Sequence, residues 1–359
     1  MESTLSSFAE RIRAAAASSA PLRLRGGGTK DFHGAQLAGD VLDTRAYAGI
    51  VSHEPSELVV TARCGTPLAE LEAALAEHGQ CLAFEPPHFG AGATVGGMVA
   101  AGLAGPARAN AGAVRDFILG TTLINGRGEL LTFGGQVMKN VAGYDVSRLM
   151  AGSWGTLALI AEVSLKVLPV APAESTLVFD DLDQAQALDR LHRWAGQPLP
   201  LNASSWWDGR LRLRLRGARA AVASATQSLG GRVLHAEEAA AHWLALREQT
   251  AAFFALAGDE CLWRLSVPDT TPPLTALGPT LIEWHGAQRW VKRARDDSAA
   301  RAAAVQASGH ATLWRTADDT HHANALTRPA EALMRIHRNL KQQFDPGGVF
   351  GRGRMYPDL

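Results

Sequence analysis

A stretch of small residues, 86–168, constrains the fold of this chain more than any other segment. It is rich in glycine, alanine and short apolar runs, and it is poor in charge. Because glycine has no Cβ, closely spaced glycines let a backbone adopt positive φ angles and approach a ligand. A shorter segment upstream, residues 25–30 with the sequence RGGGTK, has the same character. We predict that the two segments form a pair of loops that bind a diphosphate.

The glycine spacing excludes the best-known nucleotide motifs. Gly90, Gly92 and Gly96 miss the G-x-G-x-x-G spacing by one residue, and no Gly-Lys-Ser/Thr follows as in a P-loop. Signatures of zinc proteases, serine hydrolases and zinc deaminases are also missing from the sequence. The remaining chemistry is anion binding by main-chain N–H groups at turns and helix starts. The alternative is that the small residues only permit tight packing.

Composition excludes several kinds of partner. At 359 residues the chain is long enough for two domains. Lys+Arg and Asp+Glu both number 35, and a chain without excess positive charge is a poor partner for nucleic acid. Cys64, Cys81 and Cys261 form no C-x-x-C pair, so they lack the spacing of an iron–sulfur or zinc site. Such sparse cysteines are typical of a reducing compartment.

The first twenty residues do not have the pattern of a signal peptide. Glu2 and Glu10 are acidic, and Arg11 and Arg13 interrupt any apolar core. Ser7 and Glu10 instead suggest the capping box of a helix. No apolar run approaches the ~20 residues that span a bilayer. We expect a cytoplasmic protein whose contact with the inner membrane, if any, is peripheral and made through a complex.

Glycine and tryptophan divide the chain near the proline-rich segment 169–172. Most of the 36 glycines precede Pro172, whereas Trp154 is the only one of nine tryptophans that does. Such a change across a connector is typical of a domain boundary. We predict a first domain over 1–171, a second domain over 172–329 and a C-terminal segment, 330–359, that returns to the first domain.

The order of elements predicts an α+β fold. In the second domain, residues 175–235 have the order β-α-β-β-α-β of a split βαβ unit, and a similar order recurs over 261–315. Two such units predict one antiparallel, ferredoxin-like sheet with helices on one face. In the first domain, Thr66, Pro67 and Glu70 predict a helix start, and Thr94 opens a helix of small residues. Residues 114–125 are predicted to be a strand that continues into a hairpin turn.

Four spaced motifs of the first domain resemble one known superfamily. They are R-G-G-G-T-K, T-V-G-G, G-x-x-R-D-x-x-L-G and K-N-x-x-G-Y-D-x-x-x-L-x-x-G-S-x-G-T-L. This pattern is similar to the FAD-binding domain of the vanillyl-alcohol oxidase / p-cresol methylhydroxylase (PCMH-type) superfamily. Within it, the chain resembles the FAD-binding E subunits of bacterial glycolate oxidase. The tail F-D-P-G-G-V-F-G-R-G-R-M-Y resembles the closing motif of that family, except that Gly351-Arg352 replaces the usual Asn-Pro.

The resemblance implies a two-domain PCMH-type fold, noncovalent FAD and a cap domain over the isoalloxazine ring. It places the diphosphate against a first loop, the ring beside a second loop, the adenosine half near a strand start and the adenine at the backbone of Ile160. The implied FAD-binding residues are Arg25, Gly26, Gly27, Gly28, Thr29, Lys30, Pro87, His88, Gly92, Thr94, Val95, Gly96, Gly97, Arg115, Asp116, Gly143, Tyr144, Gly152, Ser153, Gly155, Thr156, Leu157 and Ile160. A covalent flavin bond to His33 is the less favoured alternative.

The resemblance also implies a function as part of a complex. It implies an FAD-binding subunit of a glycolate oxidase or dehydrogenase, which oxidises glycolate or D-lactate to the 2-oxo acid. The implied partners are a homologous FAD-containing D subunit and an iron–sulfur F subunit. Related dehydrogenases carry a metal- and substrate-binding motif G-H-x-G-D-G-N-x-H, of which only Gly309-His310 is present here. Substrate oxidation is therefore expected on the D subunit; the alternatives are a self-sufficient dehydrogenase and a structural flavoprotein subunit.

Oxidation of a 2-hydroxy acid requires a base for the hydroxyl proton and a cation for the carboxylate. His88 and His285 are weak candidates for the base, because a lone histidine without an evident partner is more often structural. The adjacent pair His321-His322 is interpreted as a solvated loop, and no metal site is predicted. Residues 210–216 alternate arginine with other residues, so one strand face is cationic. We interpret that face as solvated, or alternatively as a docking surface for an acidic subunit.

Overall fold

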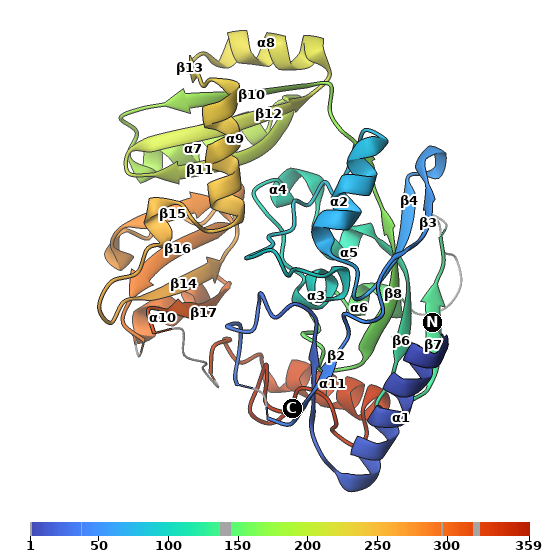
Figure 1. Ribbon diagram of the computed structural model, residues 1–359. Coiled ribbons are helices and arrows are strands. Elements are labelled where there is room, and N and C mark those ends of the chain that lie inside the picture. The colour runs from blue at the N-terminus through green and yellow to red at the C-terminus, as the bar shows by residue number, and fades with distance from the viewer. Residues whose placement is uncertain (1, 37, 137–144, 296, 319–323) are drawn as a thin grey trace.

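The chain forms two lobes, each built on an antiparallel sheet, and loops of the first lobe lie between the two sheets (Figure 1). The computed structural model describes residues 2–36, 38–136, 145–295, 297–318 and 324–359. Gly143, Tyr144, His321 and His322 lie outside the described residues.

The first lobe is built on a five-stranded sheet with a hydrophobic core on each face. Its strands, in spatial order, are β3 (Ile50–Glu54), β4 (Val59–Arg63), β8 (Leu159–Lys166), β6 (Ile118–Ile124) and β7 (Leu130–Gly134). Strand β8 contributes to both cores: Ile160, Val163 and Leu165 pack in one, and Leu159 and Ala161 pack in the other. Its register against β6 shifts between Ile160 and Glu162, and such an irregularity changes which residues face each side.

Short helices and two small sheets complete the first lobe. The helices are α1 (Glu2–Ser18), α2 (Leu68–Glu77), α3 (Val95–Ala101), α4 (Arg108–Ala111), α5 (Val114–Phe117), α6 (Val146–Leu149) and the 3₁₀ turn η1 (Pro55–Glu57). The small sheets pair β1 (Leu22–Arg25) with β2 (Asp40–Asp43) and β5 (Gln80–Cys81) with β9 (Leu168–Pro169). Helix α1 covers one face of the main sheet through Phe8, Ile12 and Ala15, whereas α2 and α3 cover the other.

The C-terminal segment lies against the first lobe. Helix α11 (Glu331–Phe344) is followed by a tail whose Val349 and Phe350 are fully buried beside α1. Lys341 Nζ donates to the carbonyl of Thr156 at 2.7 Å, and Leu22 N donates to the carbonyl of Val349 at 2.8 Å. These contacts support the proposed return of residues 330–359.

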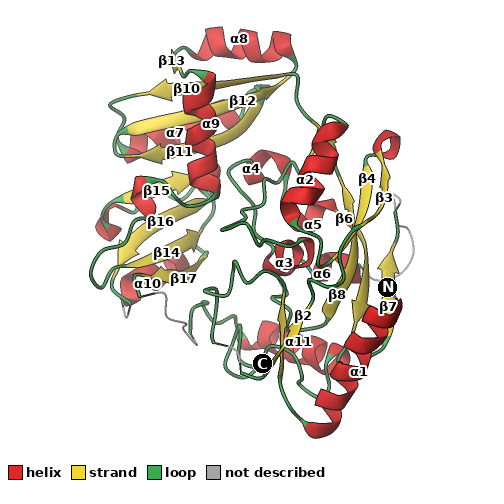
Figure 2. Cartoon of the chain, in the orientation of Figure 1, coloured by secondary structure: helices red, strands yellow, loops and turns green. Residues whose placement is uncertain are grey.

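The second lobe is one eight-stranded antiparallel sheet (Figure 2). Its strands, in spatial order, are β13 (Arg232–Val233), β10 (Ala173–Phe179), β12 (Arg210–Gly217), β11 (Leu201–Trp207), β15 (Thr280–Glu283), β16 (Gln288–Arg293), β14 (Cys261–Ser266) and β17 (His310–Thr316). The other elements are α7 (Gln184–Ala195), α8 (Arg219–Leu229), α9 (Ala236–Arg247), α10 (Ser298–Gln306), η2 (Ala252–Phe254), η3 (Thr275–Leu277) and η4 (Trp284–Gly286). The predicted β-α-β-β-α-β order is confirmed over β10 to β13.

The prediction that all helices of this sheet share one face is wrong. Helices α7, α8 and α10 pack against one face, but Trp243 and Leu246 of α9 pack on the other, with Leu262 and Trp290. That second face carries apolar residues of its own, so it also needs a cover. We keep the domain division at 171/172 and 329/330 as a proposal; every strand of the five-stranded sheet precedes the first of these boundaries.

Three local predictions are also wrong. Ser7 and Glu10 form no capping box, because α1 already begins at Glu2. Thr66 does not cap α2, because its hydroxyl donates to the carbonyl of Gly49 at 3.1 Å and accepts from the amide of the same residue at 2.9 Å. Residues 114–117 are the short helix α5 rather than the start of a strand. The predicted start of α3 is confirmed: the Thr94 hydroxyl accepts from the amide of Gly97 at 3.2 Å.

Candidate functional site

The two glycine segments meet in the structure. A Cβ added to Gly27 would lie 1.5 Å from the carbonyl oxygen of Gly92, and one added to Gly26 would lie 2.3 Å from the hydroxyl of Thr94. Gly28 has a φ of +76°, a conformation that residues with a side chain rarely adopt. The main chains of the two segments are therefore in direct contact, as their glycine content predicts, and larger residues would separate them.

A groove runs along this contact. Its first part has about 580 Å³ of empty volume and lies against the first loop, and its second part, with about 420 Å³, continues toward β8. The first part is lined by Leu24, Arg25, Gly26, Gly27, Gly28, Thr29, Lys30, Asp31, His33, Thr94, Gly97, Ala100, Ala101, Trp154 and Arg354. The second part adds Thr44, Cys64, Gly96, Gly155, Ala158, Leu159 and Ile160. Six lining residues are shared, so the two parts form one elongated site.

The lining suits an elongated, negatively charged ligand. Gly96 and Cys64 both line the second part of the groove, and their main chains are close together. A Cβ added to Gly96 would approach the Cys64 side chain to 2.6 Å, so this position requires glycine. Lys30 and Arg354 supply positive charge, and the Nε atom of Arg354 and the Nε2 atom of His33 are buried without a partner among the described residues. Buried polar atoms of this kind are normally satisfied, so a bound ligand is expected to satisfy them.

Burial strongly affects the ionisable groups at the end of the groove. It lowers the pKa of Lys30 to about 8, although the carboxylate of Glu248 opposes the shift. Burial also lowers the pKa of His33 well below its usual range, and the charges of Arg264, Arg354, Arg315 and Lys30 add to this effect. His33 is therefore neutral at physiological pH. Its ring lies 3.9 Å from the Trp154 ring and 4.5 Å from the Trp314 ring, measured between centroids.

Several of the FAD-binding residues implied by the resemblance lie outside this groove. A third cavity, with about 920 Å³ of empty volume, is lined by Arg115, Gly152, Ser153, Thr156 and Leu157 together with α11. The Asp116 carboxylate instead accepts from the amide of Ala113 at 2.8 Å. Val95 is fully buried in the core beneath the groove. Gly143 and Tyr144 are outside the described residues.

The structure places neither candidate base in the groove, and each has a partner. His88 Nε2 lies 2.9 Å from Glu72 Oε2, and the amides of His88 and Phe89 donate to Glu248. His285 Nε2 lies 2.7 Å from Asn110 Nδ2, and burial lowers the pKa of His285 to about 4. Both histidines therefore have polar neighbours that the sequence alone did not reveal.

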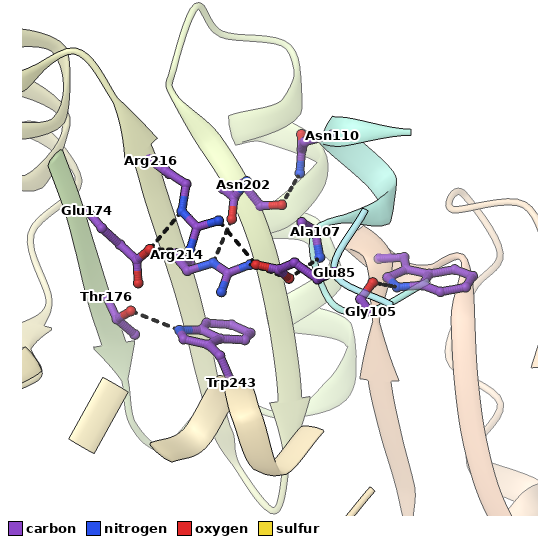
Figure 3. Close-up of polar contacts among 11 residues, drawn as sticks. Glu85, Gly105, Ala107, Asn110, Glu174, Thr176, Asn202, Arg214, Arg216 and Trp243 are labelled. Carbon is purple, nitrogen blue, oxygen red and sulfur yellow. Dashed lines mark hydrogen bonds and ion pairs between the residues drawn. The ribbon is translucent and has the colours of Figure 1, made fainter. Parts of the chain in front are cut away.

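The cationic face of β12 is turned toward the first lobe (Figure 3). Arg214 donates to both oxygens of Glu85 at 2.7 Å and to Asn202 Oδ1 at 2.6 Å. Arg216 bridges Glu85 at 3.1 Å and Glu174 at 2.5 Å. Both earlier interpretations of this face, solvation and docking of an acidic subunit, are wrong for these two arginines. They connect the lobes, next to a hydrogen bond from Trp284 Nε1 to the carbonyl of Gly105.

One known protein is similar to this chain over almost its whole length, and one family model matches its first part. The FAD binding domain family matches residues 3–134. Glycolate oxidase subunit GlcE of Escherichia coli K12 is 45% identical over 350 residues, which cover 98% of this chain and 97% of that protein. The chain belongs to the GlcE family. Membership in this family of FAD-binding oxidoreductases, together with the domain match, establishes FAD as the cofactor.

More distant relatives share the FAD domain or the fold. D-lactate dehydrogenase of Archaeoglobus fulgidus is 34% identical over 159 residues, 42% of this chain and 34% of that protein. Glycolate oxidase subunit GlcD of Bacillus subtilis is 33% identical over 94 residues, 26% of this chain and 20% of that protein. The structure of alkyldihydroxyacetonephosphate synthase matches with a TM-score of 0.66 and 15% identity. The match covers 95% of this chain and 74% of that protein. The GlcE-family chain therefore has the PCMH-type fold.

The described residues contain neither a candidate metal centre nor a candidate membrane span. Within the described ranges, no group of three or more His, Cys, Asp or Glu side chains is arranged to hold a metal ion. No described helix combines the length and the apolar character that a membrane span requires.

Proposed function

We propose that this chain is the FAD-binding subunit of a glycolate oxidase complex, which oxidises glycolate or D-lactate to the 2-oxo acid. The observation that carries the proposal is the 45% identity to the E. coli glycolate oxidase subunit across almost the whole of both chains. The contact between the two glycine segments supports it, because a diphosphate-binding groove is what such a subunit needs.

The groove residues fit an FAD molecule, and we propose how they would hold it. The main chains of residues 25–30 and 92–97 would bind the diphosphate, and Lys30 and Arg354 would balance its charge. The groove continues to Gly155 and Ile160, which would flank the adenosine end. When bound, FAD supplies an acceptor for the two electrons that the hydroxy acid loses. The rings of Trp154 and His33 line the first part of the groove and would exclude water there.

We propose that the FAD is noncovalent. His33 is only 3% exposed and its ring is packed between two tryptophan rings, so it is held in place as a wall of the site. If the proposal is right, acid precipitation of the purified protein leaves all of the flavin in the supernatant. Flavin that stays with the precipitate would support a covalent bond to His33 instead.

We propose an iron–sulfur F subunit and a homologous FAD-containing D subunit as partners. The three cysteines support the first partner, because Cys64 and Cys261 are buried in different lobes and Cys81 is only partly exposed. They cannot ligate one cluster together, so electrons that leave the FAD need an acceptor elsewhere. Contact with the membrane, if it occurs, would then be made by the complex.

The absorbance spectrum of the purified chain tests the cofactor, and co-purification tests the complex. A flavin spectrum at about one FAD per chain, together with a flavoprotein and an iron–sulfur protein that co-purify, is the expected result. Anaerobic addition of glycolate to the complex should bleach the flavin. A colourless chain that does not take up FAD would overturn the proposal. A complex in which the flavin stays oxidised after addition of glycolate and after addition of D-lactate would also overturn it.

A further inference from the structure

The third cavity, of about 920 Å³, is separate from the groove. Its walls come mainly from the segment 148–157, from helix α11 and from the tail, and none of its lining residues lines either part of the groove. The segment 152–157 divides the two spaces: Trp154 and Gly155 line the groove, whereas Ser153 and Thr156 line the cavity. The proposed FAD site therefore leaves this cavity without a role.

Most of the cavity wall is apolar. Leu149 comes from α6, Leu157 from the loop that follows it, Leu340 from α11, and Met355 and Leu359 from the tail. Small-molecule sites in proteins have volumes of roughly 300–1,000 Å³, and apolar side chains with a few polar groups line them. The cavity has both properties, so its main part suits an apolar chain or ring.

One polar atom in this wall has no partner. Ser153 is 5% exposed, and its hydroxyl makes no hydrogen bond among the described residues. Its main chain is satisfied, because the amide donates to the carbonyl of Met150 at 3.2 Å and the carbonyl accepts from the hydroxyl of Thr156 at 2.7 Å. Buried hydroxyls are normally paired, so the open hydroxyl of Ser153 points to an acceptor on a ligand.

The charged side chains of the wall are positive. Among the described residues, the cavity is lined by arginine and lysine but by no Asp or Glu. Lys341 is already paired, since its ammonium lies 2.7 Å from the Asp345 carboxylate. Arg148 pairs with Asp145 at 3.1 Å, although both side chains are more than half exposed. Arg115 is exposed and has no ion pair among the described residues, so it is available to an anion.

Arg115 and Ser153 together favour a head group with a single negative charge. The neighbouring carboxylate, Asp116, accepts from the amide of Ala113 at 2.8 Å and is held at the start of α5. A carboxylate brings one charge for the arginine and an oxygen that accepts from the serine hydroxyl. A phosphate monoester would bring about two charges, of which one arginine neutralises only half.

We propose that the third cavity binds a carboxylate that carries an apolar chain, with the carboxylate at Ser153 and Arg115 and the chain against Leu157 and Leu340. The inference goes beyond the proposed function and does not depend on it, because the cavity and the groove share no lining residue. The ligand is a second small molecule, distinct from FAD and from glycolate, which has no apolar chain.

Calorimetric titration of the FAD-loaded full chain with octanoate tests the site, at concentrations at which octanoate is monomeric. Acetate has the same head group without the chain, and 1-octanol has the chain without the charge. Octanoate should bind saturably at about one molecule per chain, and acetate and 1-octanol should each bind at least about tenfold more weakly. FAD content is measured beforehand by flavin absorbance, so a failure to load FAD counts against the proposed function and not against this site.

Two variants and two controls locate the bound octanoate. Ser153→Ala removes a buried hydrogen bond to a charged group, so it should weaken octanoate binding about tenfold. Arg115→Gln removes an exposed charge, so it should weaken binding about two- to fivefold. Ser228→Ala and Arg127→Gln make the same two changes outside the cavity, and both should bind octanoate like the unaltered chain.

Three results would overturn the inference. The first is an unaltered chain that does not bind octanoate saturably, and the second is equal affinity for octanoate and 1-octanol. The third is unchanged affinity for octanoate in both Ser153→Ala and Arg115→Gln, each shown by circular dichroism to be folded.

Discussion

Glu85→Ala tests whether the ion cluster between the lobes stabilises the protein. In the structure, the side chain of Arg214 is 3% exposed and that of Glu85 is 15% exposed. Removal of Glu85 leaves Arg214 buried, with Asn202 as its one remaining side-chain hydrogen-bond partner among the described residues. Breaking a buried pair in this way costs about 3–5 kcal/mol, because the remaining charge is desolvated without compensation. The Asn202 contact remains, so we expect the free energy of unfolding to fall by about 3 kcal/mol.

Urea denaturation followed by circular dichroism measures this change. Asp180→Ala is the matched control. Asp180 pairs at 2.6 Å with Arg210, which lies on β12 as Arg214 does, but the side chains of Asp180 and Arg210 are 42% and 49% exposed. An exposed pair contributes only about 0–1 kcal/mol. If the chain does not unfold in one step, the transition in which the lobes separate is the one compared.

The replacement of both partners separates burial of charge from loss of a contact. Glu85→Gln combined with Arg214→Met removes both charges, so it should be less destabilising than Glu85→Ala. A Glu85→Ala variant no less stable than Asp180→Ala would refute the reasoning. A double variant that is as unstable as the single one would show that shape, not charge, matters at this interface.

The remaining predictions concern the groove and one buried carboxyl group. Gly27→Ala should abolish FAD binding, because its Cβ would collide with the carbonyl of Gly92, whereas Gly135→Ala, with open space around its Cβ, should load FAD normally; equal flavin absorbance in both would contradict this. Burial lowers the pKa of Lys30 to about 8, so FAD affinity measured by flavin fluorescence should fall as the pH rises above about 8, and Lys30→Met should bind more weakly at pH 7 and lose this dependence; parallel profiles would exclude the ammonium. Burial raises the pKa of Glu283 from 4.5 to about 7, so the native state binds more protons than the unfolded state between these values, and the free energy of unfolding should fall as the pH rises through that window. Glu283→Gln should remove that slope, and it should be up to about 3 kcal/mol more stable than the unaltered chain at pH 8. Urea titrations at pH 5 and pH 8 measure both effects, and the same pH dependence of the unfolding free energy in both proteins would contradict the prediction.

The parts of the fold that local sequence predicts are those with local causes. Thr94 before a run of small residues predicts the start of α3, and Asn125-Gly126 predicts the turn between β6 and β7. Thr66 shows the limit of such reasoning. Its position suits a helix cap, but its hydroxyl pairs with Gly49, which comes close only when the lobe has folded.

The site shows the same limit on a larger scale. The approach of the two glycine segments follows from residues that have no other evident use, because only glycine permits the contact between Gly27 and Gly92. The burial of His33 in the groove could not be predicted in the same way. His33 becomes the buried ring of the groove only because Trp314 is brought over it from the other lobe, and no local pattern reports that.

The arginines of the second lobe show why a cationic pattern alone does not identify a function. Alternation in β12 predicts one face of positive charge, but the structure surrounds Arg214 and Arg216 with Glu85 and Glu174. The charge there is compensated within the chain, so it stabilises the contact between the lobes.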